Sequence, residues 1–104
     1  MVDFVYRKGI ITLLFEFDPA KSRANKRKHG IDFEEAQKLW NDLDVVEMPT
    51  KTLAEPRFIV TGRIGAKHWS AVVTYRGESI RLISVRRSWK KEIETYEKNQ
   101  SVRI

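Results

Sequence analysis

Residues 57–87 read RFIVTGRIGAKHWSAVVTYRGESIRLISVRR, and they carry the strongest secondary-structure signal in the chain. The stretches 57–63, 68–75 and 79–87 are rich in β-branched and aromatic residues, which is typical of strands. The breaks between them, Gly65-Ala66 and Arg76-Gly77-Glu78, are short enough for hairpins, so the pattern predicts an antiparallel meander. The last stretch is apolar on both alternating faces, which indicates a central strand that is covered at least partly on both sides.

The segment before the meander begins with a predicted strand at residues 10–17, which are again β-branched and aromatic. Asp18 and Pro19 then form a helix start, because aspartate is a good N-cap and proline suits the first helical position. Gly30 supplies the matching stop. We therefore expect a first helix between these residues.

A second helix is expected from Asp32 to Asn41-Asp42. Glu35 follows Asp32 at the spacing of a capping box, in which the two residues satisfy each other's backbone N–H groups. The residues at helical spacing would then share one face, and this face would pack on the sheet: Phe33, Ala36, Gln37 and Trp40.

Ser88 is expected to cap a final helix, in which Trp89, Ile93 and Tyr96 would form the buried stripe. With a short strand at 45–48, the predicted order is β-α-α-β-β-β-β-α. This order indicates an α+β fold: a small antiparallel sheet with two N-terminal helices and one C-terminal helix packed on it.

Length and composition indicate one globular domain over residues 1–104, with its body at 10–100; for residues 1–9 a flexible arm is an alternative to a strand. The absence of cysteine excludes disulfide scaffolds and thiol catalysis and favours a cytoplasmic location. The longest nearly apolar run, residues 10–15, is far too short for a membrane span. The net charge of +6 favours an anionic partner, and nucleic acid is the commonest large one.

Basic residues are concentrated first in the predicted helix that follows Asp18. Arg23 and Arg27 are neighbours one turn apart, and no acidic residue lies close to them in the sequence. A solvated helix face is the ordinary explanation for any single residue here, but the group as a whole favours an anion-binding surface. Its members are Lys21, Arg23, Lys26, Arg27, Lys28 and His29.

A second basic group lies where the last strand meets the final helix: Arg81, Arg86, Arg87, Lys90 and Lys91. Lysines in the first helical turn oppose the helix dipole, and a bound phosphate would turn that cost into a gain. The alternative is that their long side chains carry the charge into water. Regular alternation places Arg81 and Arg87 on one face and Arg86 on the other, so one arginine of the 86–87 pair could clamp phosphate while the other forms a salt bridge or a protein contact.

The chain has two histidines, His29 and His68, at no spacing typical of a metal site, so metal binding is not expected. His29 stands at a predicted helix C-terminus, where an imidazole favours a structural role. His68 begins a predicted strand after a loop and is a candidate acid or base. No motif for a nucleotide cofactor or for acyl transfer is present.

Several fragments in a fixed order make the chain resemble the BrnT-type toxins of bacterial type II toxin–antitoxin modules. The resemblance covers about residues 15–97, and residues 1 to about 12 precede the segment at which most members of the family begin. The fragments are FEFDPAK at 15–21, NKRKHGI at 25–31, FEEA at 33–36, RF at 57–58, GR at 62–63, ISVRR at 83–87 and the segment 92–97.

This resemblance implies a RelE-like fold and an endoribonuclease that inhibits translation. It also implies a BrnA-type antitoxin with a ribbon-helix-helix domain, and a 2:2 complex that binds operator DNA through the antitoxin. RNA supplies its own nucleophile, the 2′-OH, so such cleavage needs cations for the phosphate and an acid and a base, but no metal or cofactor. The catalytic candidates are Arg63, Arg81, Arg86 and Arg87 for the phosphate and Tyr75 or His68 for proton transfer. The RNA-binding candidates are Arg23, Arg27, Lys28, His29, Lys90 and Lys91.

Two other classes of function could use the same basic surface. One is a nucleic-acid-binding module without catalysis, and the other is an interaction module that holds an acidic protein partner. Cleavage products separate the nuclease from the binder. Salt weakens the complexes of a basic domain with RNA and with an acidic protein alike. Competition between partner and RNA therefore distinguishes the protein-interaction module from the other two classes better than a salt titration does.

Overall fold

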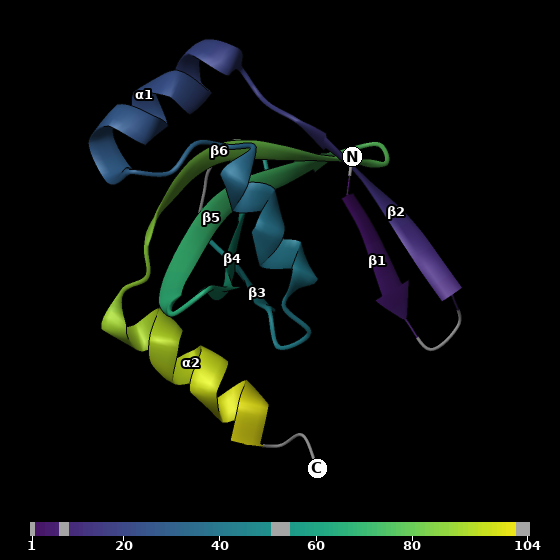
Figure 1. Ribbon diagram of the computed structural model, residues 1–104, viewed down its shortest axis with the longest axis vertical. Coiled ribbons are helices and arrows are strands. Elements are labelled where there is room, and N and C mark those ends of the chain that lie inside the picture. The colour runs from purple at the N-terminus through teal and green to yellow at the C-terminus, as the bar shows by residue number, and fades with distance from the viewer. Residues whose placement is uncertain (1, 7–8, 51–54, 102–104) are drawn as a thin grey trace.

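The computed structural model describes residues 2–6, 9–50 and 55–101, which fold into an α+β arrangement (Figure 1). Its elements in chain order are β1 (Val2–Tyr6), β2 (Gly9–Glu16), α1 (Pro19–His29), the 3₁₀ helix η1 (Glu35–Asn41), β3 (Val46–Pro49), β4 (Phe58–Ile64), β5 (Lys67–Arg76), β6 (Ser79–Arg87) and α2 (Lys90–Ser101). The predicted element order is therefore confirmed from the strand at 10–17 onward. Within residues 1–9, where the sequence allowed a flexible arm, the structure places strand β1.

The sheet is mixed, so the prediction of a wholly antiparallel sheet was wrong. Its strand order is β1-β2-β6-β5-β4-β3. The meander β4-β5-β6 is antiparallel as predicted, but β2 runs parallel to β6, with Phe15 opposite Ile80. A parallel pair needs a long crossover, and here α1, η1 and three further strands lie between the two partners in sequence. As predicted, β6 is a central strand; the RelE-like fold stays a prediction.

Helix α1 begins and ends where the sequence predicted. The Asp18 carboxylate accepts a hydrogen bond from the Ala20 N–H at 2.8 Å, and Pro19 occupies the first helical position. Gly30 ends the helix in the left-handed region with φ of 80°, where a residue without a Cβ avoids steric strain. Its N–H donates to the Lys26 carbonyl at 2.9 Å. These signals are local, which explains why sequence alone located the helix.

The second predicted helix is a 3₁₀ helix and not an α-helix. The capping box is confirmed, because Asp32 and Glu35 each accept a hydrogen bond from the other's N–H, at 2.7 and 3.2 Å. The buried residues are Phe33, Ala36 and Leu39, which recur every three residues, the repeat of a 3₁₀ helix. The predicted face with Gln37 and Trp40 assumed the wider α-helical repeat, and both of these are only half-buried.

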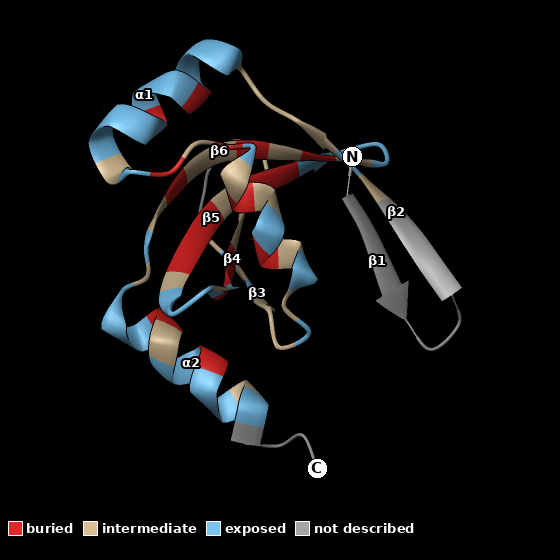
Figure 2. Cartoon of the chain, viewed as in Figure 1, coloured by how far each residue is buried: buried red, intermediate tan, exposed pale blue. Residues whose placement is uncertain are grey.

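The core lies between one face of the sheet and the segment 31–39. Val60, Ala71, Val73, Leu82 and Val85 share this sheet face by register, and they pack in one cluster with Ile31, Phe33, Ala36 and Leu39. Figure 2 shows the buried residues concentrated along β4, β5 and β6. We call this the helix face, and the other side of the sheet the opposite face.

A buried amide joins α1 to the sheet. β2 covers β6 only at residues 79–81, so the backbone of Val85 has no strand on that side. Asn25 fills the gap: its Nδ2 donates to the Val85 carbonyl at 2.9 Å and to the Ile31 carbonyl at 2.8 Å, and its Oδ1 accepts from the Val85 N–H at 3.1 Å. One side chain thus substitutes for a neighbouring peptide.

Asn25→Ala is expected to lower the free energy of unfolding by about 2–4 kcal/mol, because it leaves buried backbone groups of Val85 and Ile31 without partners. Urea denaturation of the purified protein measures this loss. Asn41→Ala, which removes an exposed amide, is the control and should change stability by less than about 0.5 kcal/mol. Equal stabilities of the two variants would contradict the role of Asn25.

A β-bulge in β6 changes which arginines share a face. Ser84 pairs with Val72 and Leu82 with Val73, so Ile83 is an extra residue and the alternation reverses at that point. Arg81 and Arg86 therefore share the opposite face, and Arg87 projects with the helix face. The prediction that Arg81 and Arg87 share a face was wrong, since it assumed a regular strand.

Candidate active site

Three of the predicted catalytic residues lie at the same end of the sheet. Arg63 at the end of β4 and His68 at the start of β5 are directly opposite each other in the β4–β5 hairpin. Arg87 is the last residue of β6, and its Nε donates a hydrogen bond to the His68 carbonyl at 3.2 Å. The same carbonyl accepts the Ser88 N–H at 3.1 Å, which fixes the connection to α2 beside His68. We call Arg63, His68 and Arg87 the hairpin-end site.

Both arginines of the hairpin-end site are exposed cations. Among the residues that the structure describes, neither Arg63 nor Arg87 has an ion pair with a carboxylate. The Arg87 guanidinium lies 5.5 Å from the centroid of the Trp69 ring, a cation–π contact that orients it without neutralising its charge. By register Arg63 projects beside His68 on the opposite face, whereas Arg87 projects with Trp69 on the helix face, so the two uncompensated charges border this end of the sheet from its two sides.

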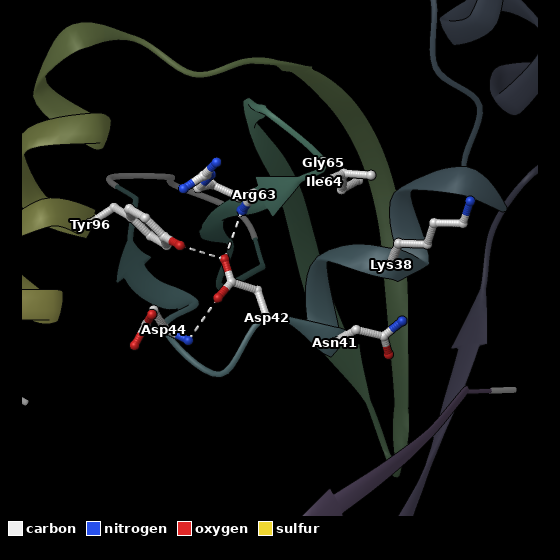
Figure 3. Close-up of a pocket in the computed structure, with 8 residues that line it drawn as sticks. All are labelled: Lys38, Asn41, Asp42, Asp44, Arg63, Ile64, Gly65 and Tyr96. Atoms are coloured by element: carbon white, nitrogen blue, oxygen red, sulfur yellow. Dashed lines mark hydrogen bonds between the residues drawn. The ribbon is translucent and has the colours of Figure 1, made fainter.

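Tyr96 of α2 contacts the ring of His68 and holds it in place. The two rings meet edge to face with centroids 5.2 Å apart, and the Tyr96 hydroxyl donates to Asp42 Oδ2 at 2.7 Å (Figure 3). Burial raises the pKa of Tyr96 well above its usual value, and the hydrogen bond to Asp42 raises that pKa further. Tyr96 consequently keeps its proton at neutral pH and acts here as a positioning residue for the imidazole.

Asp42 links three parts of the chain at the same place. Its Oδ2 also accepts the Arg63 N–H at 2.8 Å, and its Oδ1 accepts the Asp44 N–H at 2.8 Å (Figure 3). Gly62 leaves room for this approach, because a Cβ at that position would make tight contacts, 3.2 Å from Asp42 Oδ2 and 3.3 Å from the Leu39 side chain. Asp42 thus ties the end of η1, β4 and α2 together behind the hairpin-end site.

A pocket of about 520 Å³ opens beside this linkage. Lys38 and Arg63 bring positive charge to it, Asp42 and Asp44 bring negative charge, and the exposed Asn41 brings an amide, so the lining is polar and of both signs. Its lining is Lys38, Asn41, Asp42, Asp44, Arg63, Ile64, Gly65 and Tyr96 (Figure 3).

Arg86 is committed to an internal ion pair and is not available as a free phosphate clamp. Its two terminal nitrogens each donate to Glu92 of α2 at 2.8 Å, and Glu92 is only 5% exposed. Glu92 also accepts hydrogen bonds from the Ser70 hydroxyl and the Trp89 N–H, both at 2.8 Å. Of the alternatives left open for the 86–87 pair, the salt bridge therefore belongs to Arg86.

Glu92 remains ionised in this setting. Burial alone would raise the pKa of its carboxyl, but the hydrogen bonds from Arg86, the Trp89 backbone and Ser70 outweigh that cost. The net result is a pKa below the ordinary value of 4.5. The pair is thus a charged, fully hydrogen-bonded link between β6 and α2.

Arg81 and Tyr75 lie away from the hairpin-end site. His68 and Tyr75 are seven residues apart on β5, which corresponds to about 23 Å along a strand. Arg81 lies near Tyr75's end of the ladder and forms an ion pair with Glu16 at 3.5 Å. The Tyr75 hydroxyl donates to Glu47, and burial together with that carboxylate raises the pKa of Tyr75. The structure does not join these two residues to His68.

The predicted RNA-binding residues also divide into two surfaces. Arg23, Arg27 and Lys28 are exposed on α1 and His29 is half-buried there, whereas Lys90 and Lys91 are exposed in the first turn of α2. Figure 1 shows α1 and α2 at opposite ends of the molecule. Of these residues, Lys90 and Lys91 lie nearest in sequence to the end of β6 at Arg87, separated from it by Ser88 and Trp89, so they are the pair next to the hairpin-end site.

The sequence assigned Tyr96 to a buried stripe and placed Asp42 only at the end of the second helix, with no role in a site. The sequence did contain one indication of this contact: a tyrosine predicted to be buried usually needs a hydrogen-bond partner for its hydroxyl. Trp89 was wrongly placed in the same stripe, and it is 63% exposed. Ser88 is not the cap either: its hydroxyl bonds to Ser70 at 2.8 Å, and the residue before the first helical position is Trp89.

Among the described residues, no group of three or more His, Cys, Asp or Glu side chains could hold a metal ion. None of the helices in the described ranges is both long enough and apolar enough to span a membrane.

The chain was compared with known protein families and with curated proteins. The model of one family, described as ribonuclease toxin, BrnT, of type II toxin–antitoxin systems, matches residues 17–92. No curated protein matches the chain. The matched segment contains the whole hairpin-end site and Asp42, and it ends at Glu92.

Proposed function

Because this chain belongs to the BrnT family of ribonuclease toxins, we propose that it is an endoribonuclease with its active site at Arg63, His68 and Arg87. The family match also confirms the resemblance that the sequence fragments indicated. As a member of a type II toxin–antitoxin family, the protein has RNA as its substrate class and an antitoxin as its partner.

One observation carries the choice of site: two arginines without a carboxylate partner among the described residues lie at the same end of the sheet as the histidine, Arg63 directly opposite it and Arg87 bonded to its carbonyl from the other face. A phosphodiester that becomes pentacovalent gains negative charge, and preorganised cations stabilise that charge. The remaining predicted arginines, Arg81 and Arg86, already compensate Glu16 and Glu92. Their charge is therefore less available to a phosphate.

The reaction that fits these groups is attack of a ribose 2′-OH on the adjacent phosphorus. The O2′–P bond forms as the P–O5′ bond breaks, which yields a 2′,3′-cyclic phosphate and a free 5′-OH. The 2′-OH loses a proton and the leaving O5′ gains one, and an imidazole can exchange protons at neutral pH. We assign one of these two proton transfers to His68, held by Tyr96, and the other to a water molecule, and we assign phosphate stabilisation to Arg63 and Arg87.

The finer features of the family resemblance belong to the same proposal. We propose that cleavage needs no metal or cofactor, that the fold is RelE-like, and that RNA cleavage inhibits translation in the cytoplasm. We also propose a BrnA-type antitoxin, which would neutralise the toxin in a 2:2 complex and bind operator DNA. The uncompensated positive charge of the hairpin-end site supports an acidic surface on that partner.

The proposal is tested by incubating the purified protein with RNA, with and without ribosomes and with excess EDTA. The expected result is fragments with 2′,3′-cyclic phosphate and 5′-OH ends, at the same rate in EDTA. Products with 5′-phosphate ends would contradict attack by the 2′-OH, and loss of cleavage in EDTA would contradict metal independence. A complex with RNA that yields no fragments under any of these conditions would favour the non-catalytic binding module.

A further inference from the structure

Trp89 is a large aromatic side chain that the fold leaves in solvent. It lies between the end of β6 and the start of α2, and 63% of it is exposed. Burying an indole is strongly favourable, so a tryptophan that stays outside the core of a small domain marks a candidate contact surface. The two residues before it, Arg87 and Ser88, both donate hydrogen bonds to the His68 carbonyl. Trp89 therefore lies close in the chain to the hairpin-end site.

The position of Trp89 is fixed by the buried ion pair. The Arg86 guanidinium carbon lies 3.7 Å from the centroid of the indole ring and covers part of the side chain. Arg86 is itself held by two hydrogen bonds to Glu92, and Glu92 accepts the Trp89 backbone N–H. The indole is therefore preorganised in its exposed position, which lowers the entropic cost of binding a partner there.

The surroundings of the indole are positively charged. Arg87, Lys90 and Lys91 are exposed next to it in sequence, and none of them forms an ion pair within the described part of the chain. An aromatic ring face bordered by free cations is the arrangement with which proteins bind single-stranded nucleic acid, because the bases stack and the phosphates meet the cations.

We propose that Trp89 is a stacking platform for an unpaired base of the RNA substrate. Lys90 and Lys91 would contact the phosphates on either side of this base, and the strand would continue to the scissile phosphate at the hairpin-end site. This inference rests on the proposed function, since it takes single-stranded RNA as the ligand. It adds that substrate selection depends on an unpaired base at a fixed distance from the cleaved bond.

The test measures binding of the purified protein to a short fluorescein-labelled 2′-O-methyl RNA, which lacks the nucleophile and stays intact. Trp89→Ala is expected to weaken binding to the single strand by about tenfold or more and to affect the same sequence in a duplex much less, because duplex bases are already stacked. Trp89→Phe should retain most of the affinity. Leu14→Ala is the matched control, because Leu14 is 40% exposed and pairs with Ser79, at the end of β6 away from Arg87.

A second readout does not depend on the stability of the alanine variant. RNA binding should quench tryptophan fluorescence in the wild type, and Trp89→Phe should remove this quenching while RNA still binds, since Trp69 is buried and Trp40 half-buried. Equal quenching in the wild type and Trp89→Phe would overturn the proposal. The proposal would also be overturned if a folded Trp89→Ala variant bound the single strand with wild-type affinity. This includes the case in which that variant loses only its binding to the antitoxin.

The result of the Trp89 binding test can be distinguished from the result of the ribonuclease assay. If the wild type binds the 2′-O-methyl strand through Trp89 but does not cleave the corresponding RNA, the platform stands and the ribonuclease assignment fails. If RNA is cleaved and Trp89→Ala changes neither KM nor single-strand affinity, the ribonuclease assignment stands and the platform is wrong.

Discussion

Replacing His68 with glutamine is expected to slow RNA cleavage about 100- to 10,000-fold. Glutamine can still donate and accept hydrogen bonds in the half-buried position between Arg63 and Tyr96, but it cannot take up or release a proton in the transition state. The loss should therefore appear in kcat, with KM little changed. The measurement is the rate of cyclic-phosphate formation from a single-stranded RNA under saturating conditions.

The chain provides a matched control for this prediction, because His29 is its only other histidine. His29 is half-buried at the end of α1, away from the hairpin-end site, and His29→Gln should cleave at close to the wild-type rate. Cleavage by His68→Gln at the wild-type rate would show that another group transfers the proton and that the site is misplaced. A large loss in the His29 variant would point instead to α1.

Replacing Arg86 with alanine is expected to lower the free energy of unfolding by about 3–5 kcal/mol. The change leaves the Glu92 carboxylate nearly buried between β6 and α2 without its bidentate partner. The hydrogen bonds from Ser70 and Trp89 remain, but they do not neutralise the charge. Urea denaturation followed by far-UV circular dichroism measures the loss.

Two further variants distinguish this ion pair from others. Arg81→Ala breaks the more exposed pair with Glu16 and should cost less than about 1 kcal/mol. Combining Arg86→Met with Glu92→Leu removes both charges and should recover most of the stability lost in Arg86→Ala. If Arg86→Ala were as stable as Arg81→Ala, the buried pair would not hold α2 on the sheet.

The same pair makes stability depend on pH in a defined direction. Glu92 has a folded-state pKa below its ordinary value of 4.5, so its ionised form favours the folded state. This stability is fully present above that ordinary value and is lost as the pH falls through the lower pKa of the folded state. The double variant that combines Arg86→Met with Glu92→Leu should lose less stability over this acidic range than the wild type does, as urea denaturation at a series of pH values would measure.

These results also decide how loss of activity is interpreted at residues 86 and 87. A variant that lacks Arg86 is expected to be less stable, so its loss of toxicity would not locate the catalytic site. Arg87→Ala removes an exposed cation held by the Trp69 ring and the His68 carbonyl, and it leaves the ion pair intact. Arg87 is therefore the residue of the pair whose substitution tests phosphate binding.

The sequence by itself was sufficient for features whose signals are local. Asp18, Pro19 and Gly30 bounded α1 because caps and turns depend on a few adjacent residues. The hairpin breaks at Gly65 and Gly77 gave the meander for the same reason, and both glycines have positive φ. The basic composition and the ordered family fragments pointed to a ribonuclease toxin before any side chain was placed.

Tertiary structure alone decided which charges are free. Arg81, Arg86 and Arg87 are chemically equivalent in the sequence, but the bulge at Ile83 and the docking of α2 pair Arg86 with Glu92 and leave Arg87 exposed. Likewise, Asp42 and Tyr96 are 54 residues apart and meet only after η1 and α2 pack at the end of β4. Contacts between distant segments depend on strand register and packing, which residue type and local spacing do not encode. The sequence therefore showed which basic and titratable residues the chain has for binding and cleaving RNA, whereas packing determined where on the fold the site lies.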